Sequence, residues 1–550
     1  MMKKYIYYFA FLLCTYFLSS CESLEVTPPN DITDEQIKEI LNGNDNTKIQ
    51  LVLKAIGASL QNDFNIYGKT YTAYSSYPQN SQYNQDFMRN LMGNDVICGS
   101  ASTSKAFSAT YSIASPFYLA EYDWPFWALP VDCITDANKA LNYLTEEMAE
   151  KNIMVKSYRG RALSLRAYGY MLLMERFQKA YTNGGKNGKG MPIYTAYKIN
   201  DNAKISSAQE TYEFILKDLK DAVVCLKETD GYTTAVNDID LGVAQYLLAR
   251  AAIWYGDWQT CITACQDIVN HYTNFIQEAN YGGKASDAMA IAAGTKEIMA
   301  KDNAFFSLAV NPEVIMGFST GEAANTTLFY GFTNIFAGKI VDANGNECGT
   351  AGYGQEWPCI DSRLYARMDG RDFRKDNFTT EEMTYNYKID KEGNIEKRSI
   401  GKYANLKFAA TICLNSTVRD VNGYCDNVVI RSSEVYLMLA EAYAQNGKEV
   451  QAKEILNKLL AARTKKGAQA LTCDNYSGMQ KMSTLEMVQF QERIEMWCEK
   501  GLEFYNNKRW NIPVNRNGSE NHYHNVTLPV DNMTLQIPTI ETNANTHWAD

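Results

Sequence analysis

Histidine is scarce in this sequence of 550 residues, which contains only four. His271 falls at the end of a predicted helix, and His522, His524 and His547 lie in the C-terminal tail. The His522-x-His524 pair has no carboxylate or cysteine at coordinating spacing, so we predict no metal site and no cofactor. The Gly-x-Ser-x-Gly and His-Glu-x-x-His motifs of hydrolases are absent as well. We therefore predict that the chain is not an enzyme, although a glycosidase, which needs only two carboxylates, escapes this exclusion.

A hydrophobic run long enough to cross a bilayer is also lacking. Two lysines near the N-terminus precede a shorter apolar run, YIYYFAFLLCTYFLSS, which ends at Cys21. This charge layout predicts a signal peptide over residues 1–20. The LSSC stretch at 18–21 resembles the lipobox of bacterial lipoproteins, which implies cleavage before Cys21 and diacylation of its thiol. An ordinary signal peptide that happens to end in cysteine is the alternative. The polar segment 21–46 is expected to be the tether of a lipid-anchored protein.

Basic residues are fewer than acidic ones, 53 against 63, which gives a net charge of −10. Cleavage after residue 20 removes two lysines and no acid, leaving 51 against 63 and a charge of −12. A surface this acidic disfavours nucleic acid and anionic ligands, and it fits a neutral or cationic ligand. Aromatic residues are abundant instead, at 12% with 37 tyrosines, whose rings suit a half-exposed recognition surface.

Cysteine does not form a disulfide or zinc pattern. Of the 13 cysteines, two belong to the signal and lipobox region, and the remaining eleven are irregularly spaced. Cys261 and Cys265 share one helical face and are expected to act as small apolar residues. Two pairings could close a loop, Cys348 with Cys359 and Cys413 with Cys425. The sequence also suggests calcium at Asp342, Asn344 and Asn346, but Glu347 occupies the place of the EF-hand glycine, so no calcium site is predicted.

Two stretches share a helical-hairpin pattern. Residues 428–463 break at Gly447, and residues 241–270 break at Gly256. Small or packing residues occur at matching offsets from the two glycines: Ala440, Tyr443, Ala452 and Leu456 in the first stretch, and Ala249, Ala252, Cys261 and Cys265 in the second. These spacings are typical of tetratricopeptide hairpins, which stack because a single hairpin cannot bury its apolar face.

Further helices are predicted at 34–41, 51–60, 125–144, 158–177, 208–228 and 484–504. The fold class is therefore mainly α: a tetratricopeptide-like scaffold of about four helix pairs, formed mainly by residues 47–275 and 428–512. The helical period is lost over about 281–427, where we expect an irregular, loop-rich insertion with a few short strands. Strand patterns occur at 305–318 and as a hairpin about Gly393-Asn394. We expect 47–550 to form a single domain.

Two segments, 65–104 and 325–360, place aromatic rings among Ser, Asn and Gly. Such loops suit a neutral sugar, which offers C–H faces for stacking and hydroxyl groups for hydrogen bonds. The candidate ligand-binding residues, chosen from composition alone, are Tyr71, Tyr74, Tyr77, Tyr83, Asp86, Arg89, Tyr330 and Trp357. For each of them a structural role is the alternative.

The order of these pieces resembles the SusD/RagB family of Bacteroidetes surface lipoproteins. The segments that carry the resemblance are LSSC at 18–21, GRALSLRAYGYMLL at 160–173, TYEFILKDLKDAVVCL at 211–226, YLLARAAIWYGDW at 246–258, NPEVIMGF at 311–318, IRSSEVYLMLAEAYAQNG at 430–447 and ERIEMWCEKGLEFYNNKRW at 492–510. Charged residues that match family positions, and that we interpret as ties between helices, are Arg166, Glu441, Glu492, Arg493 and Arg509.

The resemblance implies a protein on the cell surface, lipid-anchored in the outer membrane. It implies capture of oligosaccharides and their delivery to a SusC-like TonB-dependent transporter, with no chemistry performed on them. A peptide-binding RagB-like member, a surface glycoside hydrolase and an assembly scaffold are the alternatives. Nucleic acid is not an expected partner.

Overall fold

The computed structural model describes residues 32–64, 82–97, 111, 116–284, 303–319, 340–341, 347–348, 358–389, 392–408 and 426–549. The chain divides into two compact units, residues 1–54 and 55–550. In the first unit, α2 (Asp34–Asn42) starts with a capping box between Thr33 and Gln36. Helix α3 (Asn46–Phe64) runs from the first unit into the second. The signal peptide and Cys21 lie outside the described residues.

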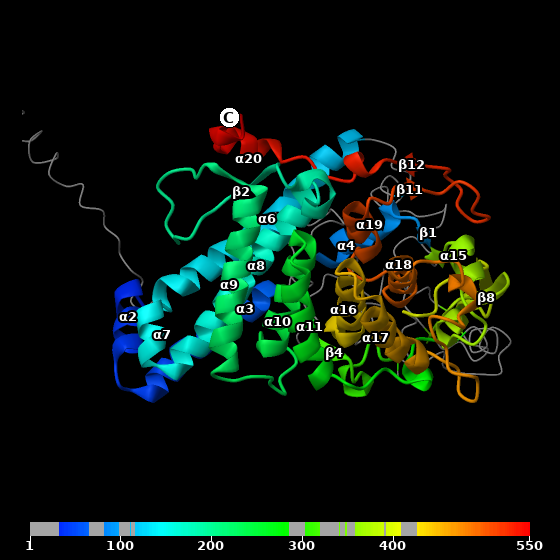
Figure 1. Cartoon of the computed structure of the whole chain (residues 1–550), viewed down its shortest axis with the longest axis horizontal. Coiled ribbons are helices and arrows are strands. Elements are labelled where there is room, and N and C mark those ends of the chain that lie inside the picture. Colours follow the sequence, from blue (N-terminus) through cyan, green and yellow to red (C-terminus); the bar gives the residue numbers. More distant parts are fainter. Residues whose placement is uncertain are drawn as a thin grey trace, which may run out of the picture. The chain divides into compact units, whose positions relative to one another are not determined.

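Three long helices of the second unit lie side by side: α6 (Pro116–Tyr143), α8 (Ile153–Phe177) and α9 (Ala208–Lys227) (Figure 1). The short α7 (Glu146–Lys151) connects the first two. Glycine permits their close approach, because a Cβ added at Gly169 of α8 would lie 2.6 Å from the Pro130 carbonyl oxygen of α6. Arg166 then ties α8 to α9 through two hydrogen bonds to Asp218, of 2.7 and 2.9 Å.

The two predicted hairpins are confirmed. Helices α10 (Leu241–Tyr255) and α11 (Trp258–His271) pack together, as do α16 (Ser432–Gln445) and α17 (Glu449–Ala462). Gly256 and Gly447 adopt φ values of +84° and +70°, a left-handed conformation that glycine tolerates and that ends each first helix. Helices α11 and α16 also pack against each other, so the two hairpins are neighbours (Figure 1).

Cys261 and Cys265 are buried free thiols whose sulfur atoms lie 3.9 Å apart, as expected of small apolar residues. Among the other cysteines, Cys348 lies on β6 (Glu347–Cys348) and Cys359 on β7 (Cys359–Ile360), in different sheets. Cys413 and Cys425, and the calcium candidates Asp342, Asn344 and Asn346, lie outside the described residues.

The insertion contributes short strands. The hairpin about Gly393 is confirmed: β8 (Met383–Ile389) pairs antiparallel with β9 (Ile395–Ile400), and Gly393 has φ +85°. With β5 (Ile340–Val341) and β6 they form a sheet of order β6-β5-β8-β9. Of the predicted strand 305–318, only β4 (Val314–Phe318) forms, and it pairs with β10 (Asn427–Arg431). Residues 428–431, predicted as helix, are therefore strand.

Smaller elements complete the fold. A π-turn, η3 (Tyr181–Gly185), leads to β2 (Lys189–Pro192), which pairs with β3 (Ile205–Ser207). The C-terminal region contains β11 (Val514–Asn515), β12 (Thr527–Leu528) and α20 (Thr539–Ala544). Short 3-10 helices lie at Glu278–Asn280, Leu308–Val310, Phe373–Asn377, Ser477–Met479, Val530–Asn532 and Thr546–Ala549. Among the helices of the described residues, none has the length and apolar character needed to cross a membrane.

The prediction of one helix over 484–504 is wrong. Helix α18 (Thr484–Glu495) ends early, and α19 (Leu502–Trp510) follows after a turn. Cys498, Lys500 and Gly501 in this turn have φ values of 61°, 53° and 65°. Long-range contacts favour this conformation, because the Trp497 indole nitrogen donates to the Asp95 carbonyl oxygen at 2.9 Å.

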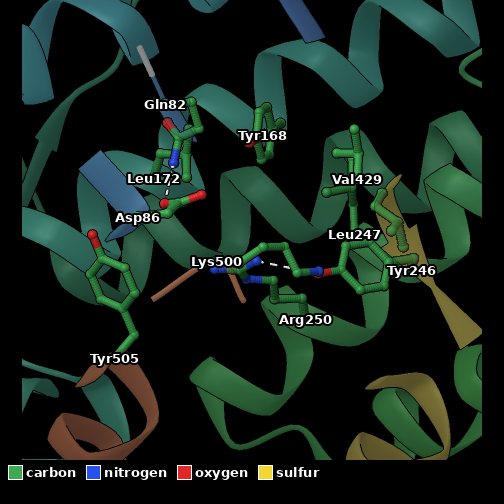
Figure 2. A pocket seen from close by; sticks show the side chains of 11 residues that line it. Gln82, Asp86, Tyr168, Leu172, Tyr246, Leu247, Arg250, Val429, Lys500 and Tyr505 are labelled. Atoms are coloured by element: carbon green, nitrogen blue, oxygen red, sulfur yellow. Dashed lines mark hydrogen bonds between the residues drawn. The ribbon is translucent and has the colours of Figure 1, made fainter. Parts of the chain in front are cut away.

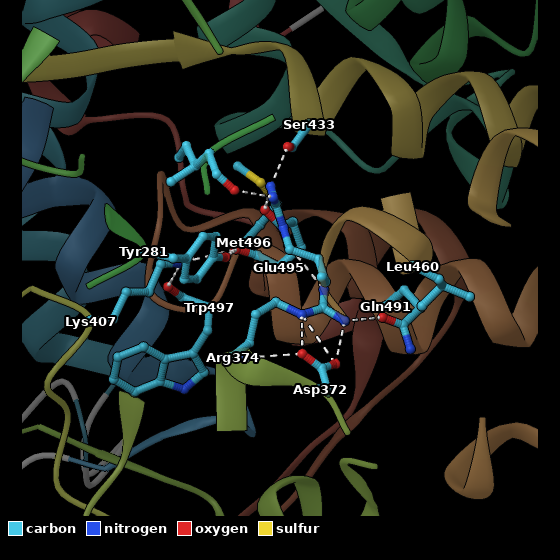
Figure 3. Close-up of polar contacts among 12 residues, drawn as sticks. Tyr281, Asp372, Arg374, Lys407, Ser433, Leu460, Gln491, Glu495, Met496 and Trp497 are labelled. Carbon is cyan, nitrogen blue, oxygen red and sulfur yellow. Dashed lines mark hydrogen bonds and ion pairs between the residues drawn. The ribbon is translucent and has the colours of Figure 1, made fainter. Parts of the chain in front are cut away.

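A buried cluster of charges joins the helical scaffold to the insertion (Figure 3). Glu495, at the end of α18, is fully buried and accepts hydrogen bonds from Arg431, Arg463 and Arg374 at 2.6 to 3.0 Å. Glu313 pairs with Arg431 and Arg463 at 3.0 and 2.6 Å. Burial by itself would raise the pKa of Glu495, but the three arginines hold it well below its usual range.

Candidate functional site

Most of the ligand residues predicted from composition lie outside the described residues: Tyr71, Tyr74, Tyr77, Tyr330 and Trp357. The segment 65–104, expected to be a loop, includes a helix, α4 (Gln82–Met92), which carries Tyr83, Asp86 and Arg89. Nothing is described of the side chain of Tyr83, whereas those of Asp86 and Arg89 are buried.

Arg89 contacts rings of two other helices. Its guanidinium lies 4.4 Å from the centre of the Phe126 ring on α6 and 5.7 Å from that of Phe504 on α19. The side chain is only 2% exposed. Such contacts attach α4 to the scaffold, so the structure supports the structural alternative for Arg89.

Asp86 faces a small enclosed cavity between α4, α8, α10 and α19 (Figure 2). The cavity leaves about 20 Å³ for the centres of water molecules, which is room for about one water and none for a sugar ring. Asp86 accepts a hydrogen bond from Gln82 at 2.6 Å. Burial raises the pKa of Asp86 to about 6, against the opposing effect of Arg176. Asp86, like Arg89, is therefore a residue of the protein interior.

The two segments predicted to contact ligand meet at a two-stranded ladder, which we call the β1–β7 junction. Strand β1 (Val96–Ile97) pairs antiparallel with β7, with Val96 opposite Ile360 and Ile97 opposite Cys359. Strand β1 belongs to the first segment, 65–104, and β7 ends the second, 325–360. The pairing thus joins one strand from each of the two segments, which lie far apart in the sequence.

A C-terminal segment, residues 516–524, fastens this junction from both sides. On the β1 side, Arg516 donates to the carbonyl oxygens of Gly93 and Leu91 at 3.1 and 2.6 Å. On the β7 side, the Asn521 amide donates to the Ile360 carbonyl oxygen at 2.9 Å. The segment therefore holds both strands in place.

His522 is fixed within this segment. Its Nε2 lies 2.9 Å from the Asn94 carbonyl oxygen, which only accepts, so Nε2 carries the proton. Its Nδ1 consequently accepts from the Tyr111 hydroxyl at 2.7 Å. Burial lowers the pKa of His522 to about 4, so the ring is neutral at pH 7. Both ring nitrogens are engaged, which leaves His522 no lone pair for the metal site considered from the His522-x-His524 spacing.

Next to His522 lies a ring cluster formed by Tyr111, Tyr523 and His524. The ring centres of Tyr523 and His524 lie 4.7 and 5.9 Å from that of Tyr111 and 4.7 Å from each other. Tyr523 is 41% exposed, and His524 is exposed as well. Exposed rings beside the β1–β7 junction have the properties expected of a sugar-stacking surface.

Sequence reasoning missed Tyr111, Tyr523 and His524. The His522-Tyr523-His524 run is a visible signal in the sequence for two of them, whereas Tyr111 stands in no such pattern. Among the charged residues expected to tie helices together, Arg509 of α19 pairs with Glu441 of α16, whereas Arg493 of α18 donates at 2.7 Å to Asp95, which precedes β1 and is not on a helix. Glu492 is buried beside Asn506, and burial raises its pKa to about 8. Within the described residues no group of three His, Cys, Asp or Glu side chains is arranged to hold a metal ion.

The described residues thus form a helical scaffold with exposed rings beside the β1–β7 junction. Comparisons with protein families identify the class to which this scaffold belongs. The model described as the SusD family matches residues 308–546, and the model described as "Starch-binding associating with outer membrane" matches residues 58–236. The chain belongs to the SusD-like family. No curated protein matches the sequence.

Solved structures share the fold. A SusD-like carbohydrate binding protein from Bacteroides vulgatus has 20% identity and a TM-score of 0.65, over 90% of this chain and 97% of that one. The surface glycan-binding protein A from Bacteroides fluxus has 19% identity and a TM-score of 0.60, over 89% and 96%. A SusD superfamily protein from Bacteroides thetaiotaomicron has 17% identity and a TM-score of 0.59, over 90% and 98%. The mainly helical architecture with few short strands, predicted from the sequence, is therefore confirmed.

Proposed function

We propose that this protein is a surface-exposed glycan-binding lipoprotein that captures oligosaccharides and delivers them to a SusC-like TonB-dependent transporter in the outer membrane. One observation carries the proposal: at the β1–β7 junction, a strand of each aromatic-rich segment pairs with a strand of the other, near the exposed Tyr523 and His524. The family description, starch-binding and associated with the outer membrane, supports the ligand class and the location. Two of the similar structures are named as carbohydrate- or glycan-binding proteins, which adds to this support.

Binding at such a site requires no covalent step. Rings stack on the C–H faces of sugars, with about 0.5–1.5 kcal/mol for each contact, so affinity comes from several weak contacts. The neighbouring polar groups suit sugar hydroxyls, which both donate and accept hydrogen bonds. Tyr71, Tyr74, Tyr77, Tyr83, Tyr330 and Trp357 stay our candidates for these contacts, and the structure adds Tyr523 and His524.

Attachment to the membrane is assigned to Cys21 and the tether 21–46. Acyl chains on the Cys21 thiol bury many methylene groups, at about 0.8 kcal/mol each, and so anchor a protein without a transmembrane helix. The tether gives the binding unit reach toward a transporter.

The test is a binding titration of the purified protein against a panel of neutral oligosaccharides and a peptide digest. We expect saturable binding to at least one oligosaccharide and no new reducing ends after incubation. Binding of peptides alone would replace glycans by peptides as the ligand, and release of reducing ends would make the protein a glycoside hydrolase.

Two double variants locate the site: Tyr523→Ala with His524→Ala, and Tyr330→Ala with Trp357→Ala. Each removes two stacking contacts, so the Kd for the oligosaccharide should rise roughly tenfold while Tm stays nearly unchanged. Tyr197→Ala, which removes a part-exposed ring between β2 and β3, is the matched control and should leave Kd unchanged. A large drop in Tm would mean that the rings belong to the core, and an unchanged Kd would place the site elsewhere.

A further inference from the structure

Four arginines lie close together after β7, and one of them differs from the other three. Arg363, Arg371 and Arg374 each pair with an aspartate two residues earlier in the chain, at 2.5, 2.9 and 2.6 Å. Arg367, at the end of α15 (Ser362–Arg367), has Tyr365 at that position instead. Among the described residues no carboxylate lies within ion-pair distance of Arg367. Within the part of the chain that the structure describes, it is therefore the arginine of this group without an ion pair.

The contacts of Arg367 fix its position without neutralising it. Its guanidinium lies 4.5 Å from the centre of the Phe490 ring, and its Nη2 is 3.5 Å from the Gly478 carbonyl oxygen and 3.7 Å from the Met482 sulfur. Its backbone passes close to Gly478, where an added Cβ would lie 2.1 Å from the Arg367 carbonyl oxygen. A guanidinium held in this way loses little freedom when it pairs with a planar anion.

Arg367 lines an open cleft of about 500 Å³ between α15 and α18, which we call the Arg367 cleft. Lys481 and Arg493 line it as well, together with apolar groups of Met482 and Ile512. Glu486 is the carboxylate in the lining, and it already accepts hydrogen bonds from the Ser483 amide and hydroxyl at the start of α18, at 2.7 and 2.8 Å. Burial lowers the pKa of Arg367 and the neighbouring Arg493 adds to this effect, whereas Asp95 and Glu486 oppose it.

The cleft lies beside the proposed glycan site. Arg493 is paired with Asp95, the residue directly before β1, and α15 follows β7 directly. The cleft is thus connected by its own walls to both strands of the β1–β7 junction. An oligosaccharide that reaches from the junction along these walls would present a sugar residue to Arg367.

We infer that the Arg367 cleft is a subsite for the carboxylate of an acidic sugar residue, so that the captured oligosaccharide contains uronic acid. Arg367 supplies two parallel N–H donors for the carboxylate, and Lys481 adds a second positive charge. Although the whole chain carries a charge of −10, which disfavours anions in general, the charge that a ligand meets is set by the groups within a Debye length of about 10 Å. This inference rests on the proposed glycan capture and specifies its substrate class.

The test compares acidic oligosaccharides containing glucuronate or galacturonate with their carboxyl-reduced, neutral counterparts, by titration of the full mature chain. For at least one pair we expect the acidic form to bind roughly tenfold more tightly, and Arg367→Gln to abolish that preference. Arg371→Gln is the matched control, since it removes an arginine that already has its own carboxylate, and the preference should remain. Arg367→Lys keeps the charge but not the two parallel donors, so it should retain only part of the preference for the acidic form.

The readout is the ratio of the Kd values of one variant for the acidic and the carboxyl-reduced oligosaccharide. Partial unfolding weakens the binding of both forms equally, so it does not mimic the loss of the preference. Equal binding of acidic and reduced forms, or a preference that survives Arg367→Gln, overturns the inference and leaves glycan capture intact. If no oligosaccharide binds but acidic peptides bind in an Arg367-dependent way, the proposed function fails and the cleft is a peptide carboxylate site instead.

Discussion

Replacing Glu495 by glutamine tests whether the buried charge cluster holds the insertion on the helical scaffold. Glu495 accepts four hydrogen bonds from Arg431, Arg463 and Arg374, and none of these side chains is more than 2% exposed. Glutamine keeps the volume but removes the charge and points an N–H₂ group at guanidinium donors.

The expected loss follows from what remains after the substitution. Adding up four charge-assisted hydrogen bonds at about 1.5–3 kcal/mol each would overstate the loss of stability. The arginines keep other partners in the variant, because Glu313 still pairs with Arg431 and Arg463, and Asp372 still pairs with Arg374. Removing one partner from a buried ion pair costs about 3–5 kcal/mol, and we expect Glu495→Gln to fall in that range. Asp221→Asn, which breaks the exposed pair with Lys217, is the control and should cost less than about 1 kcal/mol.

Urea unfolding, followed by both circular dichroism and tryptophan fluorescence, measures the free energy of unfolding of each variant. The pKa of Glu495 is depressed in the folded protein, so the stability it adds is fully present above its ordinary value of 4.5. That stability is lost as the pH falls through the lower folded pKa. The difference between wild type and Glu495→Gln should therefore be constant from about pH 7 to about pH 5 and shrink below it. A loss no larger than that of the control, or a difference that grows on acidification, would refute this reasoning.

Two further predictions concern packing and attachment. Gly169→Ala should destabilise the protein by about 1–3 kcal/mol, because the added methyl group would lie 2.6 Å from Pro130 and 2.7 Å from Ile134. Gly370→Ala is the control in the same urea assay. It should be nearly neutral, because nothing lies within 4 Å of the added group. Cys21→Ala should move the protein from the membrane fraction of the producing cell to the soluble fraction and abolish labelling by radioactive fatty acid. Retention of the label in that variant would show that the acylated residue is another one.

The helical scaffold was predictable because its signals are local. A glycine that ends one helix, with small residues at fixed distances on either side, identified the hairpins about Gly256 and Gly447. The error over 484–504 has the opposite cause. Apolar periodicity continues through that stretch, but the turn at Cys498 and Lys500 is stabilised by Trp497 and Glu495, whose partners lie elsewhere in the chain.

The candidate site was less predictable for the same reason. Composition distinguished ring-bearing segments from core helices, yet it could not show that Arg89 is covered by Phe126 and Phe504, since that depends on how α6 and α19 pack. Nor could it bring Tyr523 to Tyr111, because these residues are 412 positions apart and meet only in the folded chain. The antiparallel register of that junction is likewise absent from any local pattern.

The contacts of residues 516–524 have a consequence for when the proposed site can form during synthesis. His522 and Asn94 are 428 positions apart, so a chain still being synthesised already contains both ring-bearing segments but not the residues that hold their ends together. Every candidate contact in those segments would be present in a fragment ending at residue 510, and such a fragment should still be unable to retain a ligand. Under the proposed function, glycan recognition would therefore require the C-terminal residues as well as the aromatic-rich segments.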